Sequence, residues 1–416
     1  MGLYKLFYLV NIMKRIAILT FGTYCDQKIT YILAKKFLSN GFKVNYITNT
    51  PTSFFQENKD KNLKIITYET TNYININDPS IINTKIDWNL LFNIKILNFA
   101  YYIKTILNSI INKAVSNCDF ILIHYPALVI ASVLPSNLPI PIGIFFVAPA
   151  YPNKDIPYIM SDEINEKSFL KSSNIKEYNS SKFFLNAMSL INISTNYFQN
   201  LLEKSYIFAM WEKTSLSLPR SDLKVTQIGS IIDNENIVYT PTVKVKEFIS
   251  KTNKVYISMG SLNLGNNILP IIKSLIKNGY IVLFHGKSTE ELEKIQNNLY
   301  IYSSFIPHEW IIPKIDLVVT SGSLCMTAIA NKYGKPLIYF PTSNEQLFWA
   351  KNYYRNTGTK YIKKEGTISQ IYRKTNMILK SMENNRKLIS FSKKLKNEIS
   401  KKDSSAILVE KIKEII

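Results

Sequence analysis

Short apolar runs alternate with amphipathic helical patterns along both halves of the chain. Residues 15–21 are almost continuously apolar, as expected for a strand buried on both faces of a sheet. A helix is predicted over residues 30–39, because the apolar spacing is helical and Asn40-Gly41 then supplies a stop signal. This alternation is typical of parallel βαβ units and predicts an α/β fold.

The same pattern starts again after a polar stretch in the middle of the chain. Residues 233–243, which include Pro241, are predicted to be a linker between two domains, 13–232 and 244–385, and residues 386–416 a helical tail. Further strands are predicted at 44–48, 63–67, 119–124 and 140–147 in the first domain. In the second domain a helix is predicted at 268–277, and strands at 254–259, 280–284, 299–302, 316–320 and 337–340.

The composition agrees with two folded domains and leaves two interpretations of the charge. A chain of 416 residues, 46% of them hydrophobic, is too long for one ordinary core and too apolar for a disordered protein. The net charge of +21 reflects either solvated lysines in a chain rich in Asn, Ile and Lys, or attraction to an anionic membrane surface. Nucleic-acid binding is not favoured, because the lysines are spread along the chain.

The three cysteines indicate a reducing compartment. Cys25, Cys118 and Cys325 lie far apart without a CxxC pair, which argues against a disulfide framework or a structural zinc site. Residues 92–111 carry polar side chains at helical intervals, so they predict an amphipathic helix instead of a membrane span. We therefore expect a cytoplasmic protein, with peripheral membrane contact as the alternative that the charge leaves open.

The loop after the first strand carries a candidate base. Gly22, Thr23 and Asp26 lie between the first strand and the first helix, where catalytic groups of α/β proteins often lie. Asp26 can act as a base toward a hydroxyl group, for which burial would have to raise its pKa. The alternative is that Asp26 caps a helix that starts near Ile29.

The chain has three histidines, and a role is predicted for two of them. His124 ends a first-domain strand, so it either assists Asp26 or is a hydrogen-bonded structural histidine. His308 follows Ile306-Pro307 in a Pro-His-x-Trp motif, while His285 has no assigned role.

The second domain carries a candidate diphosphate site. The strand at 316–320 runs into Ser321-Gly322-Ser323 and then a helix, an arrangement that presents backbone N–H groups to phosphate. One strand later, Glu345-Gln346 can hydrogen-bond the hydroxyl groups of a sugar. These two motifs together indicate a nucleotide-sugar.

Two motifs resemble the UDP-glycosyltransferase superfamily, in its sterol and glycopeptide-antibiotic branch. Pro307, His308, Trp310 and Pro313 match the family's Pro-His-Asp-Trp-Leu-Phe-Pro segment, and residues 22–26 partly match its Gly-Thr/Ser-Arg-Gly-Asp loop. The resemblance implies a GT-B fold, with two Rossmann-like doubly wound domains around a central cleft and C-terminal helices that cross back to the first domain.

The resemblance also implies an activity and a set of site residues. It implies a metal-independent, inverting hexosyltransferase that needs no cofactor and moves a sugar from UDP or dTDP to a hydroxyl of a lipophilic acceptor. The first domain would bind the acceptor, with Asp26 as base beside His124. The residues implied to bind the donor are Gly22, Thr23, Gly260, Ser261, Ile306, Pro307, His308, Ser321, Gly322, Ser323, Met326, Glu345 and Gln346.

The phosphate turn departs from the family pattern. Where the family has His-Gly-Gly-Ala-Gly-Thr-Thr, Ser321 replaces the histidine, Cys325 a glycine and Met326 a threonine. Each lost contact would cost about 1–3 kcal/mol, so we expect weaker donor binding or a different donor. Two alternatives therefore stay open: a catalytically impaired partner or sugar-binding protein of the same shape, and a nucleotide-sugar epimerase.

Overall fold

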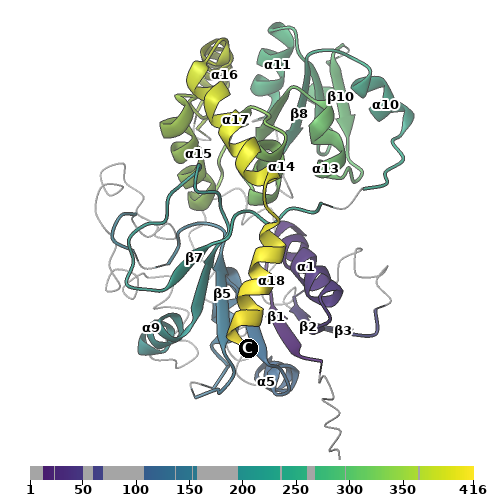
Figure 1. Cartoon of the computed structure of the whole chain (residues 1–416). Helices are drawn as coiled ribbons and strands as arrows, with labels where there is room; N and C mark the ends of the chain where they lie inside the picture. Colours follow the sequence, from purple (N-terminus) through teal and green to yellow (C-terminus); the bar gives the residue numbers. More distant parts are fainter. Residues whose placement is uncertain are drawn as a thin grey trace, which may run out of the picture.

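The computed structural model contains two parallel β-sheets, one in each half of the chain (Figure 1). It describes residues 13–22, 24–49, 60–68, 107–135, 137–151, 153–156, 195–234, 237–259, 268–295, 297–363 and 366–416. The predicted strands at 15–21, 119–124, 254–259 and 316–320 correspond to inner strands of the two sheets, whose apolar side chains are buried. The predicted strands at 63–67 and 299–302 lie at sheet edges and are partly exposed.

The first domain is built on a seven-stranded sheet within the described residues, in the order β3-β2-β1-β4-β5-β6-β7. Its strands are β1 (Arg15–Leu19), β2 (Lys43–Thr48), β3 (Leu63–Thr67), β4 (Phe120–His124), β5 (Ile142–Phe146), β6 (Tyr206–Ala209) and β7 (Val225–Gln227). Its helices are α1 (Tyr24–Ser39), α5 (Asn108–Val115), η3 (Tyr125–Ala127), α6 (Leu128–Ala131) and α9 (Thr195–Lys204).

The second domain has a five-stranded sheet among the described residues, in the order β10-β9-β8-β11-β12. Its strands are β8 (Lys254–Ser258), β9 (Ile281–His285), β10 (Leu299–Tyr302), β11 (Leu317–Thr320) and β12 (Leu337–Tyr339). Its helices are α10 (Val243–Ile249), α11 (Leu269–Lys277), α12 (Glu290–Glu293), α13 (His308–Ile311), η6 (Ile312–Lys314), α14 (Leu324–Lys332), α15 (Asn344–Thr357), α16 (Ile368–Met382) and α17 (Arg386–Ser400).

The last helix returns to the first domain. α18 (Ser404–Ile415) packs against α1, and its Leu408, Val409 and Ile412 side chains are fully buried in the core that α1 also lines (Figure 1). Lys36 and Asp403 add an ion pair of 2.8 Å beside this contact. The predicted return of the C-terminal helices is confirmed.

The structure corrects two details of the predicted elements. α1 begins at Tyr24 instead of near residue 30, so Asp26 lies within its first turn and does not cap a helix that starts near Ile29. The prediction placed that start too late because Tyr24, Cys25 and Asp26 interrupt the apolar spacing. β6 and β7 were not predicted, since strands of three or four residues are too short to show a periodicity.

The predicted amphipathic helix lies mostly outside the described residues. Of the predicted amphipathic helix at 92–111, only residues 107–111 are described, and α5 begins there at Asn108. No helix among the described residues is long and apolar enough to cross a membrane.

Candidate active site

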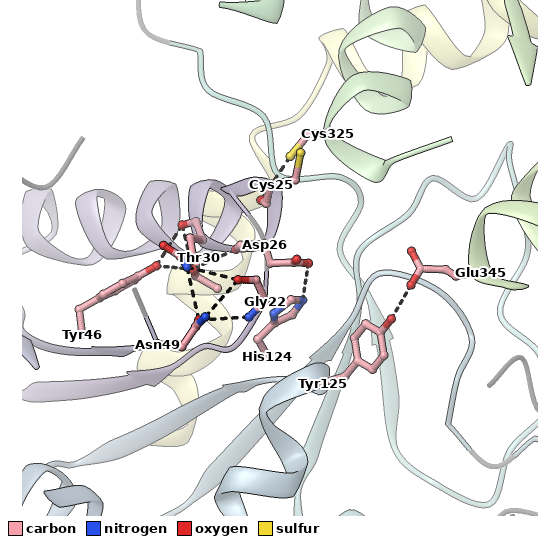
Figure 2. Close-up of polar contacts among 11 residues, drawn as sticks. Gly22, Cys25, Asp26, Thr30, Tyr46, Asn49, His124, Tyr125, Cys325 and Glu345 are labelled. Carbon is pink, nitrogen blue, oxygen red and sulfur yellow. Dashed lines mark hydrogen bonds and ion pairs between the residues drawn. The ribbon is translucent and has the colours of Figure 1, made fainter. Parts of the chain in front are cut away.

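The candidate base and His124 meet because their strands are neighbours. β1 and β4 pair in parallel, so the loop after β1 and the last residue of β4 lie at the same edge of the sheet. His124 Nε2 is 3.7 Å from Asp26 Oδ1, a distance that permits electrostatic interaction but is too long for a hydrogen bond (Figure 2). About a quarter of the Asp26 side chain, 27%, stays exposed, so the burial expected from the sequence is incomplete.

Gly22 makes room for the Asp26 carboxylate. Its φ of 142° is a backbone conformation that favours glycine, and a Cβ atom there would lie 2.4 Å from Asp26 Oδ2. The Gly22 N–H donates to Asn49 Oδ1 at 3.2 Å, and its carbonyl accepts from Gln27 Nε2 at 3.3 Å. The Asn49 and Gln27 side chains thus hold the loop in place from the end of β2 and the first turn of α1. Figure 2 shows Asn49 beside Gly22.

His124 is neutral at physiological pH. Its ring is fully buried and stacks on Phe145 at 4.8 Å. Burial lowers the pKa of His124 to about 4, although the Asp26 charge and the nearby backbone of Phe21 oppose the shift. Phe21 makes no hydrogen bond of ordinary geometry with the ring. His124 therefore presents an uncharged ring to Asp26.

Glu345 meets the first domain across the cleft. The Tyr125 hydroxyl, one residue after His124, donates a short hydrogen bond to Glu345 Oε2 (Figure 2). Burial raises the pKa of Glu345 to about 7, the Tyr125 hydrogen bond lowers it, and the Asp26 charge raises it further. The Asp26 charge thus acts on Glu345 from the first domain.

Gln346 is oriented by the residues that precede α15. Its Oε1 accepts hydrogen bonds from both the N–H and the hydroxyl of Thr342, each at 2.9 Å. Because the oxygen is occupied, the side chain can offer only its NH₂ group to a sugar hydroxyl.

The phosphate turn has the predicted backbone but fewer donors than expected. Gly322 has a φ of 104°, and its N–H donates to Thr320 Oγ1 at 3.1 Å, so this amide is already satisfied. The Ser321 side chain is buried. Ser323 precedes α14, and its side chain does not cap the helix. The backbone donors at this end of α14 are therefore the amides of its first turn.

Two predicted donor residues direct their side chains into the core. Ile306 and Met326 are both 1% exposed, so only their backbone groups can face a ligand. The predicted role of Met326 in donor binding therefore stays a prediction that concerns its backbone.

The unmatched cysteine of the phosphate turn contacts the unmatched cysteine of the first loop. Cys325 Sγ donates to the Cys25 carbonyl oxygen at 3.4 Å (Figure 2). The interaction of the two thiols lowers the pKa of Cys25, and the same interaction together with burial raises the pKa of Cys325. Both are free cysteines. Their contact joins the starts of α1 and α14 across the cleft.

His308 and its neighbours lie at the start of α13, in the segment predicted to bind the nucleotide base. Pro307 precedes α13, and His308 begins it, with the Tyr256 ring 6.0 Å away. Tyr256 also shares a hydrogen bond of 2.7 Å with His285 Nδ1. Burial, followed by the charges of Lys28 and His285, lowers the pKa of His308 to about 3, so this histidine is neutral too.

A buried ion pair lies beside His308. Lys28 Nζ on α1 is 2.5 Å from Glu309 Oε1 on α13, and their side chains are only 16% and 7% exposed. Burial alone would lower the pKa of Lys28, but the Glu309 carboxylate raises it above its ordinary value.

Three implied donor residues lie outside the described residues: Thr23, Gly260 and Ser261. Within the described ranges, no three His, Cys, Asp or Glu side chains form a group that could hold a metal ion.

Sequence reasoning missed Tyr125, Lys28, Asn49 and Gln27. Tyr125 had a weak signal, its position directly after a candidate histidine at a strand end. Lys28, one of many lysines in this chain, had none.

Comparison with known proteins gives no matching family model but several relatives. The chain is 25% identical over 203 residues to a sterol 3-beta-glucosyltransferase of Eremothecium gossypii, across 45% of this chain and 16% of that protein. It is 24% identical over 163 residues to 4'-demethylrebeccamycin synthase of Lentzea aerocolonigenes, across 38% of each. The chain thus matches well under half the length of these curated relatives.

Solved structures share the whole architecture. Medicago truncatula UGT71G1 complexed with UDP-glucose superposes with a TM-score of 0.67 at 12% identity, over 98% of this chain and 99% of that one. The spinosyn rhamnosyltransferase SpnG complexed with thymidine diphosphate gives 0.64 at 15% identity, over 96% and 100%. At such identities the likeness establishes the GT-B fold alone. The chain therefore has the GT-B fold, and its sequence is similar to part of sterol 3-beta-glucosyltransferases and of other glycosyltransferases.

Proposed function

We propose that this protein transfers a hexose from a nucleoside diphosphate to a hydroxyl group of a lipophilic acceptor. The observation that carries the proposal is the approach of Asp26 and His124 in the first domain to Glu345 of the second, which Tyr125 joins by a hydrogen bond. Asp26 lies on the first domain, and the sugar-side carboxylate comes from the second. This is the arrangement needed to hold an acceptor and a donor against each other.

In the proposed reaction Asp26 takes the proton of the acceptor hydroxyl as its oxygen attacks the anomeric carbon. A new glycosidic bond forms on one face of the sugar while the bond to the diphosphate breaks on the other, so the anomeric configuration inverts. An alcohol is a weak nucleophile until its proton begins to leave, which is why a base is needed there. Neutral His124, buried behind Asp26, would keep that carboxylate in position.

The diphosphate would leave toward the start of α14. Amides of the first turn and the helix dipole stabilise negative charge at that position. His308 and the backbone of Ile306 would face the nucleotide base, and Glu345 and Gln346 the sugar hydroxyls. We propose UDP as the nucleotide, with dTDP as the second choice, because the solved relatives above bind UDP-glucose and thymidine diphosphate.

The proposal assigns no resident metal or cofactor to the reaction, and a chelator experiment tests this. The protein is incubated with UDP-glucose or dTDP-glucose and a series of hydrophobic alcohols, with and without EDTA. A product of inverted configuration in both conditions supports the proposal. Loss of product with EDTA would contradict metal independence, and retained configuration would contradict the single-displacement mechanism.

The same experiment separates the impaired relative from the enzyme. Binding of UDP-glucose without transfer to any acceptor and without hydrolysis would favour a sugar-binding protein. Peripheral contact with anionic membranes stays a prediction, which sedimentation with anionic liposomes at low and high salt would test.

A further inference from the structure

Tyr125 connects the two halves of the proposed site. It begins η3, directly after His124, and its hydroxyl donates to Glu345 Oε2 on α15 of the opposite domain. Its ring stacks on Phe146 at 5.6 Å with an interplanar angle of 19° and meets the His124 ring edge to face at 5.5 Å. The ring is therefore held by two neighbours while its hydroxyl reaches across the cleft (Figure 2).

The hydrogen bond leaves part of Glu345 available. A carboxylate accepts hydrogen bonds at both oxygens, and Tyr125 takes Oε2. Oε1 is not used by this hydrogen bond, so it can accept from a sugar hydroxyl. Glu345 also lies in the first turn of α15, where the helix dipole favours the ionised form.

We propose that Tyr125 is a positioning residue for the donor sugar, which orients Glu345 and keeps it ionised. This inference rests on the proposed function. Tyr125 touches neither the reacting atoms nor the diphosphate in this scheme, and it acts through Glu345 alone.

The Tyr125 hydrogen bond should also affect the pH at which Glu345 titrates. Two groups face its carboxyl from the opposite domain: the Tyr125 hydroxyl, which favours the ionised form, and Asp26, which opposes it. Removal of the hydroxyl should move the titration of Glu345 from about 7 to a higher pH. At neutral pH a larger fraction of the protein would then carry a protonated Glu345, which accepts hydrogen bonds from a sugar less well.

The test compares Tyr125→Phe with Tyr151→Phe. Tyr151 is a matched control, because its ring also packs on Phe146, at 5.4 Å, while its buried hydroxyl has no hydrogen-bond partner among the described residues. Affinities for UDP and UDP-glucose are measured by calorimetry from pH 6 to 9. The ratio of the two affinities isolates the contribution of the sugar.

We expect Tyr125→Phe to bind UDP like the wild type but UDP-glucose roughly 5- to 15-fold more weakly at pH 7, the effect of one lost hydrogen bond. Its loss of UDP-glucose affinity at low pH should set in at a higher pH than in the wild type. Tyr151→Phe should match the wild type in both respects. Glu345→Gln should remove the pH dependence in either background.

Two outcomes overturn the inference and one overturns the function beneath it. If Tyr125→Phe keeps the wild-type affinity ratio and pH midpoint, Tyr125 does not position the sugar site. If it weakens UDP and UDP-glucose equally, its role is structural. If the wild-type protein binds no nucleoside diphosphate or its sugar, the proposed function itself fails.

Discussion

The side chains that meet between the two domains differ in their exposure to solvent. His124 is buried against Phe145 and stays neutral, while Asp26, less than 4 Å away, keeps part of its surface in solvent. Glu345 has a pKa of about 7. A carboxylate that is open to an acceptor and a histidine that carries no charge are suited to proton abstraction from an alcohol.

The buried histidine predicts a pH-dependent stability. Its folded-state pKa is about 4, against an ordinary value of 6.5, so between these values only the unfolded chain binds the proton. The stability that neutral His124 contributes is complete above pH 6.5 and is lost as the pH falls toward 4. Between pH 7 and 5 the wild type should lose about 2 kcal/mol more unfolding free energy than His124→Phe, as measured by urea denaturation. Parallel curves for the two proteins would contradict the assignment.

Substitution of Gly22 should lower the transfer activity without lowering nucleotide binding. In Gly22→Ala the new Cβ atom would collide with Asp26 Oδ2 and move the carboxylate. We expect transfer to fall by about 100-fold, the effect of misplacing a catalytic group by roughly 1 Å, with UDP affinity retained.

Gly41→Ala is the control for this substitution. Gly41 also has a positive φ, 82°, but no atom lies within 4 Å of a Cβ built there. Gly41→Ala should therefore lower the unfolding free energy without lowering the transfer activity. Equal losses of activity in the two variants would show that backbone strain, and not the Asp26 contact, is responsible.

At the scale of elements, α1 contacts both α13 and α14 of the opposite domain through residues with no obvious role in the sequence. Lys28 pairs with Glu309, and Cys25 accepts a hydrogen bond from Cys325. The strands, the helix stops and the motifs at strand ends followed from local periodicity. These contacts did not, because they join residues some 300 positions apart. The departures at Cys25 and Cys325 looked like two separate defects, but in the structure they are one contact.

The Lys28–Glu309 pair predicts an asymmetric effect on stability. Because both side chains are largely buried, Lys28→Met leaves an unpaired carboxylate and should cost about 3 kcal/mol of unfolding free energy. The double variant Lys28→Met with Glu309→Leu should recover most of this loss. The exposed pair of Lys154 and Asp222 is the control, since Lys154→Met should cost less than about 1 kcal/mol. A double variant as unstable as Lys28→Met would refute this account.

At the scale of the whole molecule, the C-terminal helix holds the two domains together. α17 packs against α14 and α15 in the second domain, and α18 then crosses to α1 in the first. The GT-B architecture was predictable because both halves repeat the same strand and helix pattern. The closeness of the start of α1 in the first domain to α13 and α14 of the second domain was not predictable, since it depends on how this last segment docks.

The α18 contact predicts a local loss of stability. Leu408 is fully buried against the first domain, so Leu408→Ala should cost about 2–5 kcal/mol. Hydrogen exchange should rise in α1 and stay unchanged in α11 and α16, which pack against each other in the second domain. Ile389→Ala on the exposed side of α17 is the control and should change neither. Uniform faster exchange in both domains would argue against a local effect.

The most direct test of the central claim measures binding and turnover of UDP-glucose in the wild type and in Asp26→Asn. The account predicts that both proteins bind UDP-glucose with the same dissociation constant, within about twofold. It also predicts that Asp26→Asn loses transfer and hydrolysis by at least about 100-fold, because proton abstraction contributes that much or more. Wild-type turnover in Asp26→Asn, or no binding of UDP-glucose by either protein, would contradict the account.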